Sequence, residues 1–319
     1  MYSRIAGTGS YLPERVLTNF DLEKIVETSD EWIRTRTGIE RRHIAGDDET
    51  TSDLAYRAAV AAMESAGVVG SDIDLVLVGT TTPDLIFPNV GCLLQERLGI
   101  RGGPAFSLEA ACSGFMYALS VADQMIKGGQ ARRALVVGAE TMSRIVDWTE
   151  RETCVLFGDG AGAVILEASP EPGVLYSKLG ADGRYRDLLY ASSGVSKPKD
   201  AEAIPALRMK GNEVFKVAVK TLETMVDEVL ETTGVDKGAI DWLIPHQANI
   251  RIIKATAKRL QMPMERVVLT VAEHGNTSAA SVPLALDAAV RDGRVKRGDL
   301  LLLEAFGGGF TWGAALVRF

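Results

Sequence analysis

Short apolar runs alternate along the chain with longer segments of helical periodicity, and this alternation predicts an α/β protein. The expected buried strands are residues 75–78, 134–137, 163–166, 243–244, 267–271 and 300–303. The expected helices are residues 52–66, 115–126, 214–230, 250–260 and 284–290.

The order of these elements repeats, which indicates an internal duplication. Residues 72–79 (DIDLVLVG) resemble 239–246 (AIDWLIPH), and residues 133–140 followed by 158–166 resemble 299–305 followed by 307–317. Cys112 stands eleven residues before Asp123, and Asn276 eleven residues before Asp287. A duplication would place Cys112 and Asn276 at related helix entries beside a pseudo-twofold axis. Chance similarity between two α/β halves is the alternative.

Two domains are expected from the length of 319 residues. They are an N-terminal half, residues 1–170, and a C-terminal half, residues 171–319. The best candidate for their connection is a stretch rich in Pro, Gly, Ser and charged residues, from about residue 169 to 205.

Composition excludes several functions. A formal net charge of -7 argues against nucleic acid as a partner. No apolar run approaches the roughly 20 residues that span a bilayer, so no membrane association is expected. Three cysteines without a C-x-x-C pair fit a reducing compartment, which predicts a cytoplasmic protein. The three histidines and three cysteines form no cluster with metal-ligand spacing, so no metal is expected.

Three side chains stand where catalytic groups collect. Cys112 precedes a helix, whose dipole favours a thiolate, although a buried structural cysteine is the alternative. His246 follows an expected strand, at the edge where α/β proteins bind ligands, but a packing histidine fits as well. Asn276 lies in a polar loop before a helix, where a helix cap is the competing interpretation.

Two glycine clusters, residues 158–162 and 307–309, lack the spacing and the following helix of a dinucleotide fingerprint. Glycines before a strand instead let backbone N–H groups approach a ligand, as an oxyanion hole requires.

The segment 249–261 has an apolar side and a basic stripe that includes Arg251, Lys254 and Lys258. Such a stripe is either a solvated helix face or a docking surface for an acidic carrier protein near His246.

Taken together, six segments resemble the β-ketoacyl-[acyl carrier protein] synthase III family of the thiolase-like superfamily. They are residues 31–40 (EWIRTRTGIE), 110–115 (AACSGF), 157–162 (FGDGAG), 245–249 (PHQAN), 275–281 (GNTSAAS) and 306–312 (FGGGFTW). The resemblance covers essentially the whole chain. It implies a thiolase-like five-layer αβαβα fold made of two similar halves, and a homodimer.

The same resemblance assigns roles to individual residues. The catalytic residues would be Cys112, His246 and Asn276, and the backbone N–H groups of Cys112 and Gly308 would form the oxyanion hole. The expected coenzyme A contacts are Thr28, Trp32, Arg36, Arg151, Gly211, Phe215, Ala248 and Asn249. The expected acyl pocket is Phe87, from the neighbouring subunit, with Leu156, Leu189 and Leu207. The expected carrier-docking residues are Lys216, Arg251 and Lys258.

The implied reaction is a decarboxylative Claisen condensation that initiates fatty acid elongation. An acyl-CoA primer, acetyl-CoA or another short acyl-CoA, would load Cys112, and malonyl-[acyl carrier protein] would then condense with release of CO₂. No cofactor is expected, because coenzyme A thioesters are the substrates. The alternatives are a related Cys-His-Asn condensing enzyme of polyketide or quinolone biosynthesis, or a non-catalytic acyl-thioester binding protein.

Overall fold

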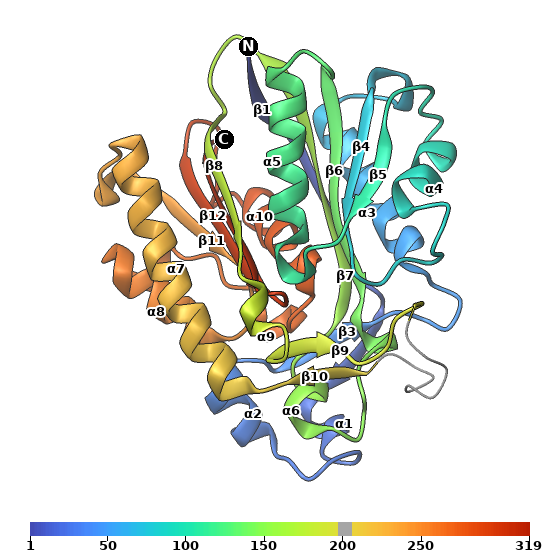
Figure 1. Ribbon diagram of the computed structural model, residues 1–319, viewed down its shortest axis with the longest axis vertical. Coiled ribbons are helices and arrows are strands. Elements are labelled where there is room, and N and C mark those ends of the chain that lie inside the picture. The colour runs from blue at the N-terminus through green and yellow to red at the C-terminus, as the bar shows by residue number, and fades with distance from the viewer. Residues whose placement is uncertain (197–205) are drawn as a thin grey trace.

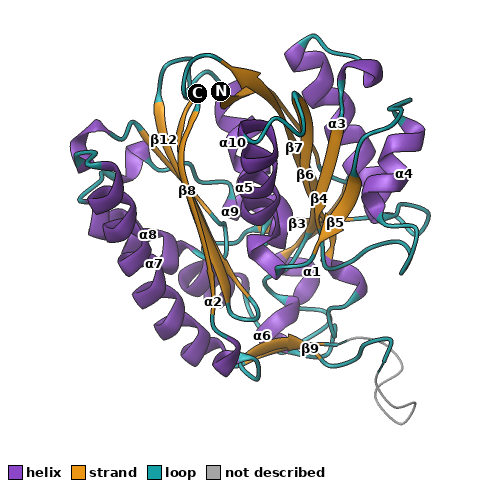
Figure 2. Cartoon of the chain, turned by 45° about the horizontal axis from the view of Figure 1, so that its top comes forward, coloured by secondary structure: helices purple, strands orange, loops and turns teal. Residues whose placement is uncertain are grey.

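The computed structural model of the chain describes residues 1–196 and 206–319 and contains two large β-sheets with helices between them (Figure 1). In this central layer lie α5 (Gly114–Lys127) and α10 (Ser281–Arg291), which contact both sheets. On the outer face of the first sheet lies α3 (Thr51–Ala66), and on the outer face of the second lies α7 (Gly211–Thr233), packed on α8 (Ile250–Leu260). The expected order of layers, αβαβα, is therefore present, and Figure 2 shows α5 between the sheets.

The first sheet has the strand order β1-β7-β6-β4-β5 and the second the order β11-β12-β13-β8. The strands of the first are β1 (Tyr2–Tyr11), β4 (Leu75–Gly79), β5 (Ala105–Leu108), β6 (Arg133–Thr141) and β7 (Asp159–Ser169). Those of the second are β8 (Val174–Ala181), β11 (Trp242–Pro245), β12 (Leu300–Gly307) and β13 (Thr311–Arg318). Two small sheets pair β2 (Arg15–Thr18) with β3 (Arg41–Ile44), and β9 (Leu189–Ala191) with β10 (Leu207–Met209). The remaining helices are α1 (Asn19–Leu22), α2 (Asp30–Thr37), α4 (Val90–Arg97), α6 (Arg151–Cys154) and α9 (Val271–His274).

The apolar strands are covered on both faces, which explains their unbroken hydrophobic sequence. In β4, Val76 and Val78 belong to the core beneath α3, whereas Leu75 and Leu77 belong to the core around α5 and α10. All four side chains are fully buried. Replacing a leucine at such a position by alanine typically costs about 2–5 kcal/mol of stability, so this alternation fixes the register of the sheet against the helices.

Both sheets use the same sequence of pairings. In the first sheet, β1 pairs antiparallel with β7, β7 pairs antiparallel with β6, and β6 pairs parallel with β4. In the second sheet, β8 pairs antiparallel with β13, β13 pairs antiparallel with β12, and β12 pairs parallel with β11. β5 continues the first sheet in parallel with β4.

The strand expected at residues 267–271 is not formed. At the place that corresponds to β5, the second sheet has only an isolated parallel bridge between Leu243 and Val267. The N–H of Val268 donates to the carbonyl of Leu243 at 2.9 Å. The chain then enters α9 at Val271. The apolar run therefore lies beside the sheet edge but is too short to continue along it.

The expected connection also proved to be more ordered than its composition indicates. Its first part contains β8, which pairs with β13 inside the second sheet, and β9. Residues 197–205 of this stretch lie outside the described residues.

The two aspartates that mark the sequence repeat are buried at matching places. Asp123 on α5 accepts from Ser3 of β1 at 2.6 Å and pairs with Lys127, four residues later, at 2.8 Å. Asp287 on α10 accepts from Thr8 of β1 at 2.7 Å. It also pairs with the cation four residues later, Arg291, at 2.8 Å. Both central helices are thus hydrogen-bonded to β1 through aspartates at equivalent positions.

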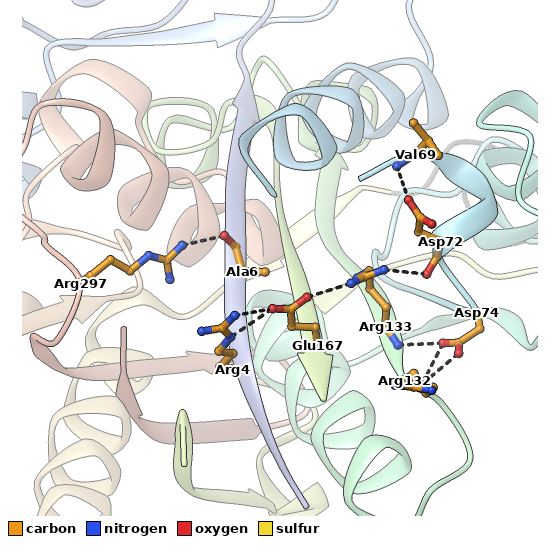
Figure 3. Close-up of polar contacts among 9 residues, drawn as sticks. All are labelled: Arg4, Ala6, Val69, Asp72, Asp74, Arg132, Arg133, Glu167 and Arg297. Atoms are coloured by element: carbon orange, nitrogen blue, oxygen red, sulfur yellow. Dashed lines mark hydrogen bonds and ion pairs between the residues drawn. The ribbon is translucent and has the colours of Figure 1, made fainter. Parts of the chain in front are cut away.

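A polar network joins β1 to β7 and β6 (Figure 3). Glu167 of β7 lies between Arg4 of β1, at 2.8 Å, and Arg133 of β6, at 3.0 Å. Arg297, from the loop after α10, donates to the carbonyl of Ala6 at 2.6 Å. Partial burial tends to raise the pKa of Glu167, but the two arginines outweigh it and the net shift is downward. The carboxylate is therefore held ionised between the strands.

Within residues 1–196 and 206–319, every helix is too short or too polar to cross a lipid bilayer.

Candidate active site

The structure brings Cys112, His246 and Asn276 together in one cavity of about 810 Å³, part of which is open solvent. The three residues come from different elements: Cys112 from the turn before α5, His246 from the end of β11, and Asn276 from the loop between α9 and α10. Apolar side chains form most of the wall, and several of them come from α7, α8 and β12. The cavity is therefore a mainly apolar pocket with a few polar groups, which is usual for ligand sites.

Cys112 occupies a tight turn at the start of α5. Ala111, directly before it, has a left-handed φ of 45°, an uncommon conformation for alanine that is found mainly where a site demands it. Gly307 makes room for this turn, because a Cβ there would lie 2.6 Å from the backbone nitrogen of Cys112. Burial raises the pKa of the Cys112 thiol to about 12. The thiolate expected from the helix dipole is thus opposed by desolvation, and the thiol is the resting form.

The ring of His246 is hydrogen-bonded to Ser281, a residue for which the sequence predicts no such role. The Ser281 hydroxyl lies 2.7 Å from Nδ1 of His246 and accepts from the N–H of Gln247 at 2.7 Å. In the tautomer in which the hydroxyl donates to Nδ1, Nε2 carries the ring proton. Burial lowers the pKa of His246 to about 4, so the ring is neutral at physiological pH. His246 therefore offers a neutral N–H donor.

Asn276 is oriented in the same manner. Its Oδ1 accepts from the N–H of Ser278 at 2.9 Å, which assigns the side-chain oxygen and leaves the amide Nδ2 as a donor toward the cavity. Its backbone pairs with the strand region before β7: its N–H donates to Leu156 at 2.9 Å, and its carbonyl accepts from Gly158 at 3.0 Å. The asparagine is thus no helix cap but an immobilised amide donor.

Gln247 holds the loop that carries His246 through four hydrogen bonds, a role that its place in the 245–249 motif does not predict. Its amide nitrogen donates to the carbonyls of Pro245 and Val268 at 2.8 and 3.0 Å. Its Oε1 accepts from the N–H groups of Thr270 and Val271 at 2.9 and 3.0 Å. One fully buried side chain thereby joins the end of β11 to the start of α9.

The residues expected to contact coenzyme A fall into two groups. Four of them line the cavity: Gly211, Phe215, Ala248 and Asn249. Three others gather outside it, where the guanidinium carbons of Arg36 and Arg151 lie 5.0 and 4.9 Å from the ring centre of Trp32. Thr28 is near this group, because Arg151 donates to the carbonyl of the preceding Glu27. Among the described residues, the buried Thr28 hydroxyl has no hydrogen-bond partner.

The expected acyl pocket is only partly assembled. A second cavity of about 1130 Å³ reaches Cys112 from the other side and is lined by Leu189, Leu207 and Gly308. Leu156 lines the first cavity instead. Phe87 lines neither cavity; its side chain is 83% exposed on the loop between β4 and α4. Its place beside exposed Ile86 and Leu85 makes an apolar patch on the surface.

The basic stripe lies on the exposed side of α8, beside the cavity. Arg251 sits over the ring of Phe215 at 4.7 Å, and Phe215 lines the cavity wall. Lys258 and Lys216 are exposed on α8 and α7. Arg259, by contrast, is paired with Asp227. The cations expected to dock a carrier are therefore accessible, and one of them borders the cavity.

In the part of the chain that the structure describes, His, Cys, Asp and Glu side chains form no group of three or more that could hold a metal ion.

Comparison with known proteins agrees with this geometry. Residues 106–183 match the family model 3-oxoacyl-[acyl-carrier-protein (ACP)] synthase III, and residues 230–319 match the model of its C-terminal region. The chain is 66% identical over 321 residues to the β-ketoacyl-[acyl-carrier-protein] synthase III of Xanthomonas campestris pv. campestris, covering 100% of this chain and 99% of that protein.

Solved structures are similar over the same length. The 3-oxoacyl-[acyl-carrier-protein] synthase III of Aquifex aeolicus VF5 has a TM-score of 0.94 at 50% identity, covering 99% of this chain and 100% of the other. The priming β-ketosynthase of the R1128 polyketide biosynthetic pathway has a TM-score of 0.94 at 39% identity, covering 99% and 96%.

Proposed function

The chain belongs to the β-ketoacyl-[acyl-carrier-protein] synthase III family, and we propose that it performs the family's decarboxylative condensation with Cys112 as nucleophile and with His246 and Asn276 as hydrogen-bond donors. The chain is thus an acyltransferase-type condensing enzyme of fatty acid biosynthesis. The single observation that carries the residue assignment is the convergence of a buried thiol and two oriented N–H donors in one cavity.

In the first half-reaction, Sγ of Cys112 attacks the carbonyl carbon of an acyl-CoA primer, acetyl-CoA or another short acyl-CoA. The oxyanion would be stabilised by the backbone N–H groups of Cys112 and Gly308, both of which border the second cavity. Coenzyme A leaves, and the acyl group remains on Cys112. Because one cavity serves both substrates in turn, ping-pong kinetics are expected.

In the second half-reaction, malonyl-[acyl carrier protein] enters and its thioester oxygen accepts from Nε2–H of His246 and Nδ2–H of Asn276. Negative charge grows on that oxygen as CO₂ leaves, so fixed donors lower the barrier more than they stabilise the ground state. The resulting carbanion attacks the acyl-Cys112 carbonyl and releases the β-ketoacyl thioester. No cofactor is needed for these steps beyond the coenzyme A and carrier thioesters themselves.

The remaining contacts of the substrates are part of the same proposal. Trp32, Arg36, Arg151 and Thr28 would bind the nucleotide end of coenzyme A, and the unpartnered Thr28 hydroxyl supports this placement. An adenine between Trp32 and Arg151 needs a separation of about 7 Å, whereas the present separation is 4.9 Å. Binding would therefore require Arg151 to swing away from Trp32.

A homodimer belongs to the proposal because Phe87 is exposed in the single chain. The neighbouring exposed residues Leu85 and Ile86 form an apolar surface with it, which a partner subunit would cover. The partner's copy of this loop would then complete the acyl pocket. A cytoplasmic location is inferred from the reaction's carrier-bound substrates.

A second candidate is a related condensing enzyme of polyketide biosynthesis, which the similarity to the R1128 priming ketosynthase favours. Turnover with malonyl-[acyl carrier protein] against other malonyl thioesters, using a panel of acyl-CoA primers, distinguishes the two. A non-catalytic acyl-thioester binding protein would show no turnover with any pair.

The nucleophile is tested by replacing Cys112→Ser and measuring transfer of a radiolabelled acyl group from acyl-CoA to protein. We expect label on the wild type and none on the variant, since a serine hydroxyl is a far weaker nucleophile in this site. Cys92→Ser is the matched control, because it removes the half-exposed cysteine and leaves the cavity intact. Stoichiometric label on Cys112→Ser would remove Cys112 from its role.

A further inference from the structure

Glu140, at the end of β6, is fully buried and is not used by the condensation chemistry above. Three consecutive threonines after β4 surround its carboxyl group. Thr81 and Thr82 donate both backbone N–H and hydroxyl groups to it, at distances from 2.6 to 3.2 Å. Thr80 donates its hydroxyl at 3.2 Å. All these groups are donors, which favours the ionised carboxylate, but burial outweighs them and the net shift of the Glu140 pKa is upward.

One more donor connects this carboxylate to the active site. The Ser278 hydroxyl donates to Oε1 of Glu140 at 3.1 Å. Ser278 and Cys112 also line the same second cavity, and the Ser278 hydroxyl lowers the pKa of the Cys112 thiol. Ser278 has a left-handed φ of 50°, a conformation that non-glycine residues adopt rarely and mainly at functional sites. Ser278 therefore lies beside Cys112 at the second cavity and is hydrogen-bonded to a buried carboxylate.

The energetics of the two acids favour an exchange between them. Burial raises the pKa of Cys112 to about 12, the Ser278 hydroxyl opposes this rise, and the Glu140 charge adds to it. Burial likewise raises the pKa of Glu140. Ionising the thiol to solvent would leave two buried anions side by side. Moving its proton to Glu140 instead keeps a single buried negative charge, so the desolvation cost hardly changes.

We propose that Ser278 and Glu140 form a buried proton relay that takes up the thiol proton of Cys112 when its sulfur attacks the acyl-CoA. The S–H bond breaks as the proton passes to Oγ of Ser278, whose own proton moves to Oε1 of Glu140. The sulfur electron pair forms the bond to the acyl carbon, and the C–S bond to coenzyme A breaks. Coenzyme A leaves as a thiolate and takes a proton from solvent water at the cavity mouth.

The relay runs in reverse in the second half-reaction. When the carbanion attacks the acyl-enzyme, Cys112 is expelled as a thiolate, and the proton stored on Glu140 returns to it through Ser278. This inference rests on Cys112 being the nucleophile of the proposed function. It assigns to Glu140 the base role in acylation, which leaves His246 neutral and free to act as a donor in condensation.

The test follows alkylation of Cys112 by iodoacetamide, which needs no acyl substrate, as a function of pH. Mass spectrometry of the Cys112 peptide separates its modification from that of Cys92. In the wild type the rate should rise with pH as Glu140 ionises and then form a plateau. In Ser278→Ala and Glu140→Gln the plateau should vanish, with a loss of roughly 100-fold or more at pH 7, and the rate should rise tenfold per pH unit as free thiolate appears.

Charged neighbours and folding are controlled within the same series. Glu109, whose charge also raises the Cys112 pKa, and His246 are unchanged in every variant. Ser278→Ala keeps the backbone N–H that orients Asn276. Thr81→Val is the matched control, because it removes one hydroxyl from Glu140 without touching the path to Cys112.

The outcomes separate the relay from the proposed function. A relay predicts that Ser278→Ala, Glu140→Gln and the double variant are equally slow, while Thr81→Val keeps the plateau. A wild-type plateau retained in Ser278→Ala, or lost equally in Thr81→Val, would overturn the relay. Failure of acyl-CoA to label wild-type Cys112 would instead reject the proposed function, whatever the alkylation profile.

Discussion

Removing either of the two donors, His246→Ala or Asn276→Ala, should separate the half-reactions of the enzyme. Both side chains are fixed before substrate arrives, by Ser281 at 2.7 Å and by the N–H of Ser278 at 2.9 Å. Loss of one such preorganised donor costs about 2.7–4 kcal/mol of transition-state stabilisation, or on the order of 100- to 1000-fold in rate. Each variant should lose that factor in decarboxylation, because the charge that it stabilises exists only while CO₂ leaves.

Acylation of Cys112 should fall far less in both variants, since neither donor contacts the thiol proton in the proposed path. The assay uses the same preparations for two measurements: label transferred from radiolabelled acyl-CoA to protein, and CO₂ released from malonyl-[acyl carrier protein] on pre-acylated enzyme. Ser281→Ala is the graded control. It keeps both donors and loses only the hydrogen bond that selects the tautomer, worth about 1 kcal/mol, so a roughly fivefold loss is expected.

The pH profile adds an independent check. Burial lowers the pKa of His246 to about 4, so the ring stays neutral from pH 8 down to about pH 5. The rate of decarboxylation should therefore fall through protonation of His246 only as the pH approaches 4. An acid limb centred near 6.5 would contradict the buried, neutral donor. If His246→Ala stopped acylation while sparing decarboxylation, the histidine would be the base for Cys112 and the assigned roles would be wrong.

Two further predictions concern the surface and the stability of the protein. Arg251→Glu should weaken turnover with malonyl-[acyl carrier protein] much more than acylation by acyl-CoA, because exposed cations steer an acidic partner. The salt dependence of turnover should also be smaller than in wild type. The control is Lys296→Glu, at an exposed lysine after α10, and equal losses with both substrates would exclude docking at Arg251. Burial raises the pKa of Glu304 to about 8, so its contribution to stability is complete below about pH 4.5 and is lost as pH rises through 8. The stability of Glu304→Gln relative to wild type, measured as the difference in free energy of unfolding in urea, should therefore increase between pH 5 and pH 8 by about 3 kcal/mol or more. An equal difference at the two pH values would show that the carboxyl is solvated.

The alternation of apolar runs predicted the layers well because strands covered on both faces have an unmistakable composition. β4, β6, β7 and β12 and the central helices follow from it. The pattern failed at residues 267–271, where burial beside the sheet edge needs the same apolar side chains as a strand. It also missed β8, whose residues are mostly half-buried and therefore show no clear period.

The residues that meet in the candidate site could be predicted from the sequence, but the residues that orient them could not. Cys112, His246 and Asn276 stand in short motifs, whereas Ser281, Ser278 and Glu140 act through contacts between residues 34 to 138 positions apart. Serines in front of a helix normally indicate caps, and only the folded chain shows that these two reach a histidine and a carboxylate. The role of Phe87 stays a prediction, because its side chain is exposed and lines neither cavity.

The anchoring of both central helices to β1 has a consequence for how the protein is made. Ser3 and Thr8 lie on β1 and are synthesised well before their partners Asp123 and Asp287, which are 120 and 279 residues further along the chain. At a synthesis rate of about 5–20 residues per second, Thr8 waits roughly 15 to 60 seconds for Asp287. During that interval the nascent chain carries an unfinished strand with buried-type hydroxyls exposed to water. Completion of the fold therefore depends on the synthesis of α10, and a chain that stops before α10 leaves Thr8 without its carboxylate partner.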